Sequence, residues 1–277
     1  MSRLLLLVTP PKEGNFHNDN HVHLARAFEA MDWAVVVQPH TYVLDHEVTD
    51  FDLVWPVGFG PREGYDARVT ALSEVPISKI VTSAVKQRDL HSKSAWLTHA
   101  PETHLSKSTE ALQEVAKDQI AKDQGRWVLK PNAGSFGRAV QLITDPKQIA
   151  LPNSEEWLLQ RYVEEIVDGE YRTIIAGSEV IGTYKRIPQD GFKANLSQSA
   201  QALEAELPDG DQAIVTNIHQ TLMTENIGFA AIDTCAGFVM EVNVANPGGI
   251  STLEKLYGGD PAVQIAKAVL AILKERT

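Results

Sequence analysis

A lysine that leads directly into a glycine-containing loop is the part of this chain best suited to phosphate chemistry. Residues 127–130 are an apolar run typical of a strand; the run ends in Lys130, and Gly134 and Gly137 follow in the loop. Glycines let backbone N–H groups come close to an anion, and a lysine adds a compact positive charge. The order differs from that of a Walker P-loop, in which the lysine follows the glycines. Alone, the pattern also fits an ordinary surface turn.

A second chemical signal lies about one hundred residues further along the chain. Residues 228–243 contain two apolar runs joined by a short turn with a glycine, which predicts a β-hairpin. Glu241 and Asn243 are two positions apart, so they project from one face of the second strand. Met240 and Val242 are expected to project from the other face. The hairpin therefore presents two oxygen-bearing side chains side by side.

The first strand of this hairpin carries a further carboxylate, Asp233. It joins the face of Glu241 if, for example, Asp233 lies opposite Val239 and Ala231 lies opposite Glu241. Aspartate, glutamate and asparagine together offer hard oxygen ligands that suit Mg²⁺ bound between protein and nucleotide phosphates. An acidic hairpin on its own is more often a solvated face. Beside a lysine and glycine loop, the magnesium interpretation gains weight.

The chain resembles ATP-grasp ligases, and among them the bacterial glutathione synthetase family. The resemblance extends from about residue 79 to the C-terminus and depends on an ordered series of short segments. These segments are 87–93, 101–103, 128–131 with its glycine loop, 160–162, 168–172, 186–191, 194–196, Asp233, 241–244 and Pro247. Each segment alone is weak, whereas the whole series in this order and spacing is specific.

The resemblance implies a site for ATP as co-substrate, with Mg²⁺ or Mn²⁺ as cofactor. The expected contacts to the ATP phosphates are Lys93, Lys130, Gly134 and Gly137. The expected contacts to adenine and ribose are Gln160, Arg161, Tyr162 and Glu170. The expected metal ligands are Asp233, Glu241 and Asn243. The expected catalytic residues are Lys130, Arg172 and Arg186, with the arginines near the transferred phosphate and the acid substrate.

This chain departs from the family pattern at two places. Its glycine loop, residues 133–137, is less rich in glycine than is usual in the family. Where the family typically has an arginine before Gly-Asn-Leu, Lys193 precedes Ala194, Asn195 and Leu196. A lysine cannot form the bidentate fork that an arginine makes with a carboxylate. The identity of the acid substrate is therefore less closely defined than the use of ATP.

The implied reaction is amide formation through an acyl phosphate. A carboxylate resists attack by an amine because its leaving group would be oxide, so phosphorylation must come first, and this step is catalysed mainly by positioning and electrostatics. The leading hypothesis is a ligase that joins γ-glutamylcysteine to glycine. The alternatives are the same chemistry on another amino acid, peptide or protein terminus, and a nucleotide-binding regulator without catalysis.

Composition agrees with a globular enzyme that acts on small acids and amines. The 277 residues carry a formal net charge of −11, which argues against nucleic acid or an anionic membrane as a partner. The single cysteine, Cys235, excludes an intrachain disulfide and fits a cytoplasmic location. Residues 4–8 are too short an apolar run for a membrane span or a signal peptide and predict a buried strand. The family resemblance suggests a homo-oligomer.

The elements that must position these residues predict a mixed α/β and α+β chain with the ATP-grasp fold. Short apolar runs at 4–8, 34–37, 53–55 and 80–82 alternate with a helix at 20–32, which predicts an N-terminal parallel α/β domain over residues 1–86. Residues 87–277 form the expected ATP-grasp region. Its lid subdomain is expected at about 98–160. Further helices are predicted at 109–124, 211–226 and 261–275.

Overall fold

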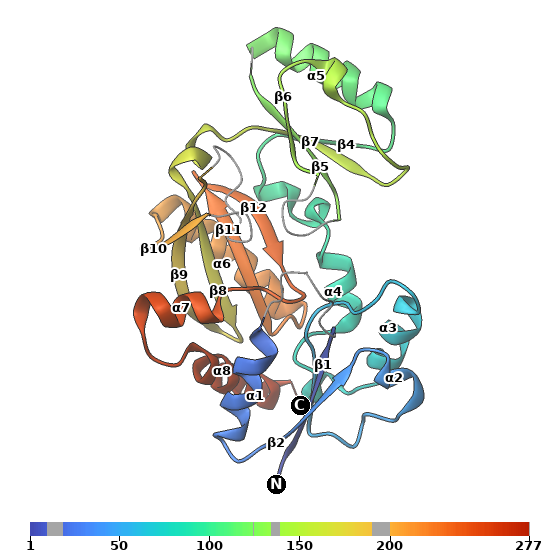
Figure 1. The fold of residues 1–277 in the computed structure, drawn as a ribbon, viewed down its shortest axis with the longest axis vertical. Coiled ribbons are helices and arrows are strands. Elements are labelled where there is room, and N and C mark those ends of the chain that lie inside the picture. Colours follow the sequence, from blue (N-terminus) through green and yellow to red (C-terminus); the bar gives the residue numbers. More distant parts are fainter. Residues whose placement is uncertain (10–18, 124, 134–138, 190–199, 277) are drawn as a thin grey trace.

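The computed structural model describes residues 1–9, 19–123, 125–133, 139–189 and 200–276, and these form three sheets with their covering helices (Figure 1). A four-stranded sheet lies at the top of the view, a five-stranded sheet in the middle and a three-stranded sheet at the lower right. Of the described helices, none is long and apolar enough to cross a membrane. The predicted phosphate loop residues Gly134 and Gly137, and Lys193 to Leu196, lie outside the described residues.

The three-stranded sheet is parallel, as predicted, and has the order β2-β1-β3. Its strands are β1 (Arg3–Val8), β2 (Ala34–Pro39) and β3 (Leu53–Pro56). Its neighbouring helices are α1 (Asn20–Glu29), α2 (Tyr42–Asp45), α3 (Tyr65–Ser73) and α4 (Ala84–Leu90). Alternate leucines of β1 enter different clusters, because Leu4 and Leu6 pack with α1 while Leu5 and Leu7 pack with α2 and α3. Burial on both faces explains the unbroken apolar run.

The predicted strand at residues 80–82 is wrong. Ile80 and Thr82 each form one isolated bridge, Ile80 to Val54 and Thr82 to Ile227. The short 3₁₀ turn at Ile77–Lys79 immediately before them leaves too few extended residues for a ladder. The apolar residues still enter the core, since Ile80 and Val81 are buried.

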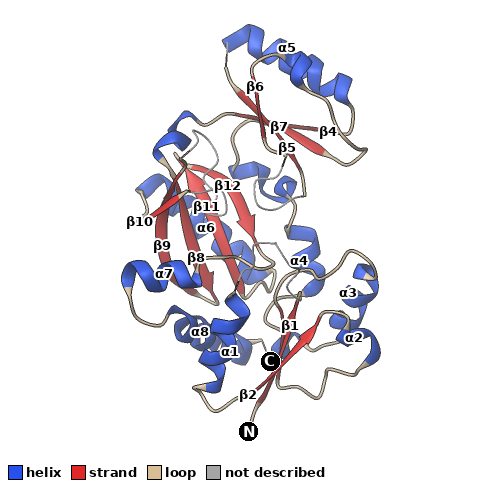
Figure 2. Cartoon of the chain, viewed as in Figure 1, coloured by secondary structure: helices blue, strands red, loops and turns tan. Residues whose placement is uncertain are grey.

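The four-stranded sheet is antiparallel, with the order β4-β7-β5-β6. Its strands are β4 (Thr103–Ser106), β5 (Trp127–Pro131), β6 (Gln141–Ile143) and β7 (Trp157–Arg161), and α5 (Thr109–Asp123) covers one face (Figure 2). Trp127 and Leu129 pack toward α5, so the alternate residues Val128 and Lys130 face the opposite way. This sheet occupies the segment expected to form the lid, and the division of the chain into domains remains a prediction.

The five-stranded sheet is antiparallel, with the order β10-β9-β8-β11-β12. Its strands are β8 (Glu170–Ala176), β9 (Glu179–Ile187), β10 (Gln201–Glu204), β11 (Phe229–Cys235) and β12 (Phe238–Asn243). Helix α6 (Asp209–Thr224) lies behind it in Figure 2. Ile218 and Leu222 of α6 pack on Ala230 and Ile232, which leaves the other face of β11 for the site. The predicted packing of this helix behind the hairpin is confirmed.

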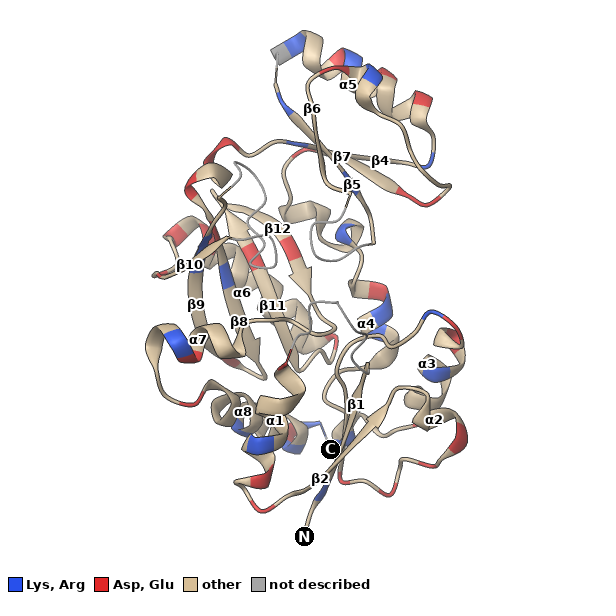
Figure 3. Ribbon diagram, viewed as in Figure 1, with Lys and Arg blue, Asp and Glu red and all other residues tan. Residues whose placement is uncertain are grey.

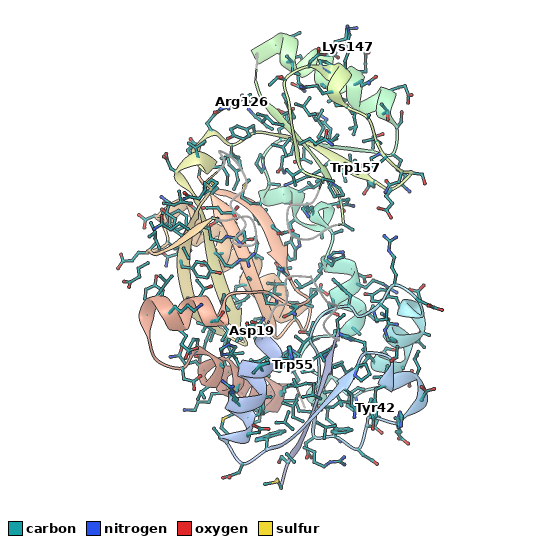
Figure 4. The ribbon with its side chains drawn as sticks, in the orientation of Figure 1. Asp19, Tyr42, Trp55, Arg126, Lys147 and Trp157 are labelled. Atoms are coloured by element: carbon teal, nitrogen blue, oxygen red, sulfur yellow. The ribbon has the colours of Figure 1, made fainter. Side chains whose placement is uncertain are left out.

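The N-terminal sheet and the five-stranded sheet share one core with α7 (Ile250–Tyr257) and α8 (Pro261–Glu275). Trp55, labelled in Figure 4, connects the two sheets. Its ring meets Phe28 of α1 and Phe229 of β11 edge to face, with centroid distances of 6.3 and 5.6 Å. Edge-to-face pairs add to the stabilisation from burial. The site therefore lies on a sheet that is anchored, through Phe229 at the start of β11, in the apolar core shared with the N-terminal sheet.

Candidate active site

Charged residues gather on one face of the five-stranded sheet. Arg172 on β8 is in register with Asp233 on β11, and Asp233 is in register with Glu241 on β12. One row earlier on the sheet, Glu170 pairs with Arg186 of β9. Figure 3 shows both signs of charge on these central strands. Because directly opposed residues of antiparallel strands share a face, the register alone brings these five predicted site residues together.

The hairpin register differs from the expected one. Asp233 lies opposite Glu241 instead of Val239, and the ladder shifts between Asp233 and Thr234. The expected shared face of Asp233 and Glu241 is found. However, the bulge adds one residue to β12 and turns Met240 away from the side of Val242. The predicted placement of Met240 and Val242 on one common face is therefore wrong.

Two arginines bind the carboxylate of Asp233. Arg172 donates from Nε to Oδ1 and from Nη2 to Oδ2 of Asp233, each at 2.7 Å, and Nη2 of Arg186 lies 2.7 Å from Oδ2. Burial alone would raise the pKa of Asp233, but the two guanidinium groups outweigh burial and hold the pKa below its usual value. Both carboxylate oxygens of Asp233 are thus engaged by cations within the sheet.

Glu170 completes this charged group from the edge nearest β9. Its carboxylate accepts a hydrogen bond from Nη2 of Arg186, and both side chains are buried. Burial raises the pKa of Glu170, and the charge of Arg186 opposes that rise. Arg186 therefore bridges two carboxylates, those of Glu170 and Asp233.

Two lysines face the same carboxylate row from outside the sheet. Lys93 begins the 3₁₀ segment Lys93–His99, and its Nζ lies 3.1 Å from Oε1 of Glu241. Lys130 is buried at the end of β5. Burial, and then the neighbouring charge of Lys93, lower the pKa of Lys130 to about 8, while Glu241 and Glu170 act in the opposite direction. The two lysines therefore contribute positive charge to one place between the two antiparallel sheets.

An apolar cluster lies beside these charges, between the four-stranded and five-stranded sheets. Tyr162, Val163 and Ile166 are buried there, and Met240 packs against them. Val128 and Leu142 of the four-stranded sheet also pack there, as does the buried Cys235 of β11. Sequence reasoning missed Met240 and the two lid residues, because only the bulge in β12 directs Met240 to this side. An apolar cluster between two sheets offers side chains on which a flat aromatic ligand can pack.

The three residues expected at adenine have different surroundings. Nε2 of Gln160 donates to Oγ1 of Thr103 at 2.8 Å, and Gln160 is buried. Tyr162 lies in the apolar cluster, with the guanidinium of Arg126 4.3 Å from its ring centroid; Arg126 is labelled in Figure 4. Arg161 is exposed and in register with Trp127, on the face of the sheet that packs on α5. The side chain of Arg161 is therefore directed away from the cluster.

The donor set on β11 and β12 fits a hard divalent cation. Asn243 lies opposite Ala231, so it shares the face of Asp233 and Glu241. Carboxylate and amide oxygens are preferred ligands of Mg²⁺ and Mn²⁺. Within the described parts of the chain, no three histidine, cysteine, aspartate or glutamate side chains are close enough to form a metal site by themselves. Mg²⁺ ordinarily completes its coordination with water and nucleotide phosphate oxygens.

Comparisons with known proteins agree with this geometry. The profile of the prokaryotic glutathione synthetase ATP-grasp domain matches residues 92–258. Glutathione synthetase of Prochlorococcus marinus subsp. pastoris is 29% identical over 259 residues, covering 88% of this chain and 84% of that protein. Glutathione synthetase of Neisseria meningitidis serogroup A is 29% identical over 215 residues, covering 74% of this chain and 67% of that protein.

Solved structures show the same fold at low sequence identity. D-cycloserine synthetase superposes with a TM-score of 0.72 at 18% identity, covering 98% of this chain and all of that chain. The D-alanine–D-alanine ligase of Bacillus anthracis, solved with ATP, gives a TM-score of 0.65 at 14% identity and covers both chains completely. A RimK-domain ATP-grasp protein of Sphaerobacter thermophilus gives 0.63 at 19% identity, covering 97% of this chain. The expected ATP-grasp fold is confirmed.

Proposed function

The chain belongs to the prokaryotic glutathione synthetase family of ATP-grasp proteins, and from this premise we propose that it joins γ-glutamylcysteine to glycine. It is an ATP-dependent, amide-forming ligase. One observation carries the proposal. The row formed by Arg172, Asp233 and Glu241 lies beside Lys93 and Lys130, next to the apolar cluster that contains Tyr162 and Met240. An enzyme that transfers a phosphoryl group needs cations and metal ligands together with an apolar surface for the nucleotide base.

ATP would bind with its base between the two sheets and its phosphates toward the lysines. Tyr162 and Met240, which belong to one apolar cluster, would offer apolar contact to adenine. Glu170, at the start of β8, is the proposed contact to ribose. Lys93 and Lys130 would neutralise phosphate oxygens, because their amines already face the same carboxylates.

The metal ligands proposed on this face are Asp233, Glu241 and Asn243. They would hold Mg²⁺ or Mn²⁺, which supplies charge neutralisation to the nucleotide phosphates when it is bound. In the structure, guanidinium groups donate hydrogen bonds to both carboxylate oxygens of Asp233, and Nζ of Lys93 forms an ion pair with Oε1 of Glu241. These cations hold the acidic residues in place and prevent their mutual repulsion.

Arg172 and Arg186 would stabilise charge during phosphoryl transfer. An oxygen of the acid substrate attacks the γ-phosphorus, the bond to the ADP oxygen breaks, and an acyl phosphate forms. The amine of the second substrate then attacks the acyl carbon, loses a proton, and expels inorganic phosphate. Fixed guanidinium groups stabilise both steps without reorganising, because packing and ion pairs already hold them. Water must be excluded from the acyl phosphate, which is the role proposed for the four-stranded sheet as a lid.

A second candidate is the same ligation on another amino acid, a peptide or a protein terminus. The N-terminal side of the site favours it at one point. The ring of Phe59 packs on that of His91 at a centroid distance of 4.5 Å and on that of Tyr65 at 5.9 Å. His91 lies two residues before Lys93 in the sequence. Burial and the charge of Lys93 lower the pKa of His91, so this wall is neutral and aromatic. Such a wall suits a substrate with an apolar group.

The experiment that tests the proposal measures ADP and phosphate release with Mg²⁺ and ATP. γ-Glutamylcysteine with glycine is compared with a panel of other acid and amine pairs, and products are identified by mass spectrometry. Release coupled to tripeptide formation would support glutathione synthesis. Release with a different pair would retain the ligase mechanism and change the substrates. No release of ADP and phosphate with any pair of a broad panel, together with tight ATP binding, would favour a nucleotide-binding regulator instead.

A further inference from the structure

The two lysines that face the phosphate site come from separate parts of the chain. Lys130 is the next-to-last residue of β5 in the four-stranded sheet, whereas Lys93 begins the 3₁₀ segment whose Trp96 packs beside β12 of the five-stranded sheet. A lysine side chain is long and has many rotamers, so its amine can hold a defined position only if the backbone that carries it is fixed. One backbone hydrogen bond connects the two regions directly, since the N–H of Lys93 donates to the carbonyl of Asn132 at 3.0 Å.

The side chain of Asn132 reinforces this connection with both ends of its amide. Oδ1 accepts a hydrogen bond from the N–H of Ser94 at 2.9 Å. Nδ2 donates to Oγ of Ser94 at 2.9 Å and to Oε2 of Glu156 at 2.6 Å. The backbone N–H of Asn132 also donates to the carbonyl of Glu156 at 3.0 Å. Asn132 is therefore tied to the segment of Lys93 on one side and to the start of β7 on the other.

We propose that Asn132 is a positioning residue that holds the backbone of Lys93 against the end of β5, so that the amines of Lys93 and Lys130 meet the same phosphates. This inference rests on the proposed function, which assigns both lysines to ATP. An amide is suited to the task because it donates and accepts simultaneously. An aliphatic side chain would leave the N–H of Ser94 and the carboxylate of Glu156 without these partners. Asn132 would act through Lys93 and would not itself contact the reacting atoms.

The first test replaces Asn132 with alanine. The dissociation constant for ADP, measured by calorimetry without turnover, is expected to rise about tenfold, because alanine keeps the backbone bond to Lys93 but loses the side-chain bonds to Ser94 and Glu156 that hold this segment in place. The KM for ATP should rise similarly, while kcat changes by less than about twofold, since the transition-state arginines are untouched. Thermal unfolding is recorded for every variant.

A donor-acceptor exchange distinguishes positioning from general stability. Asn132→Asp is expected to weaken ADP binding as alanine does, because a carboxylate would face Glu156 and could no longer donate to it. Glu156→Gln alone should bind ADP normally, since its amide oxygen still accepts from Asn132. The double variant N132D/E156Q restores one hydrogen bond with the roles reversed. It is expected to recover most of the ADP affinity. This comparison distinguishes positioning from general stability even if N132A unfolds.

Asn153→Ala is the matched control. Asn153 lies in the exposed stretch before β7; its side chain accepts from Nε1 of Trp157 and the N–H of Glu155 and donates to Oε2 of Glu155, so these three bonds do not reach the segment of Lys93. ADP affinity should be unchanged in N153A, whatever happens to its melting temperature. Equal loss of affinity in N153A and N132A, or no recovery in the double variant, would overturn the inference. Unchanged ADP binding in Lys130→Met would overturn the proposed phosphate role as well.

Discussion

Arg172 on β8 and Asp233 on β11 lie in register and share two hydrogen bonds of 2.7 Å, one to each carboxylate oxygen. Because both side chains are buried, removal of one partner leaves an incompletely neutralised charge in the core of the sheet. Arg172→Gln is expected to lower the free energy of unfolding by about 3 kcal/mol, measured by urea denaturation. Amide synthesis should fall further than ATP binding, because the role proposed for this guanidinium is to stabilise the transferred phosphoryl group.

Two further variants check this prediction. Arg88→Gln removes the same charge from an exposed pair with Asp89, at 3.0 Å, and should change stability by less than about 0.5 kcal/mol. The double variant R172Q/D233N should regain part of the lost stability, because both buried charges are removed together, but it should remain inactive. An unchanged turnover rate in R172Q would refute the catalytic role.

Glu241→Gln is expected to abolish ATP turnover and leave the fold intact. The substitution keeps the size of the side chain but removes the negative charge needed to hold a divalent cation. Phosphate release is measured beside the far-ultraviolet circular dichroism spectrum. Glu179→Gln, the same substitution at an exposed position of β9, serves as the control and should behave like the parent protein. Amide synthesis retained by E241Q would contradict the metal assignment.

The shared face of the acidic residues could be predicted because it depends on local alternation. Glu241 and Asn243 are two apart in one strand. On β11, Ala230 and Ile232 pack on α6, so the alternation of side chains places Asp233 on the opposite face of that strand. Both faces of β11 are buried, so this alternation defines the faces but not the register. The five-stranded sheet confirms the shared face of Asp233 and Glu241, in a register that differs from the expected one.

The contacts made by these residues could not be predicted in the same way. Arg172 and Asp233 are 61 positions apart and meet only because β8 lies between β9 and β11, which no local pattern encodes. The bulge that redirects Met240 inserts a single residue and leaves the apolar pattern nearly unchanged. Asn132 gave no signal either, because its role depends on partners at Ser94 and Glu156.

The affinity for nucleotide should decline above about pH 8 because Lys130 loses its charge there. Burial and Lys93 lower the pKa of Lys130 to about 8. Titration of the dissociation constant for ADP from below to above this pH should show the decline. Lys130→Arg keeps its charge throughout this range, so its profile should be flat near that pH. A parent profile as flat as that of the arginine variant would show that Lys130 does not titrate at the phosphates.

Protein stability should respond to the same titration with a defined sign. Lys130 has a pKa of about 8 in the folded protein and 10.5 as the ordinary value, so the folded state releases its proton first as pH rises. Below about pH 8 both states are charged, and the folded state bears the full cost of a buried ammonium group. Lys130→Met should therefore unfold at higher urea concentration than the parent at neutral pH. This advantage should shrink between about pH 8 and pH 10.5; a constant advantage would contradict it.

Met240 should contribute to recognition of the adenine base alone. It packs in the apolar cluster that contains Tyr162, between the two sheets, on the side to which the bulge directs it. Met240→Ala is expected to weaken ADP binding by about tenfold, since an apolar side chain of this size contributes roughly 1.5 kcal/mol or more when it covers a ligand. Competition by inorganic tripolyphosphate should be unchanged, because that ligand lacks a base. Met223→Ala on α6, behind the sheet, is the control. Equal weakening of ADP and tripolyphosphate binding would show that Met240 supports the phosphate site and does not contact adenine.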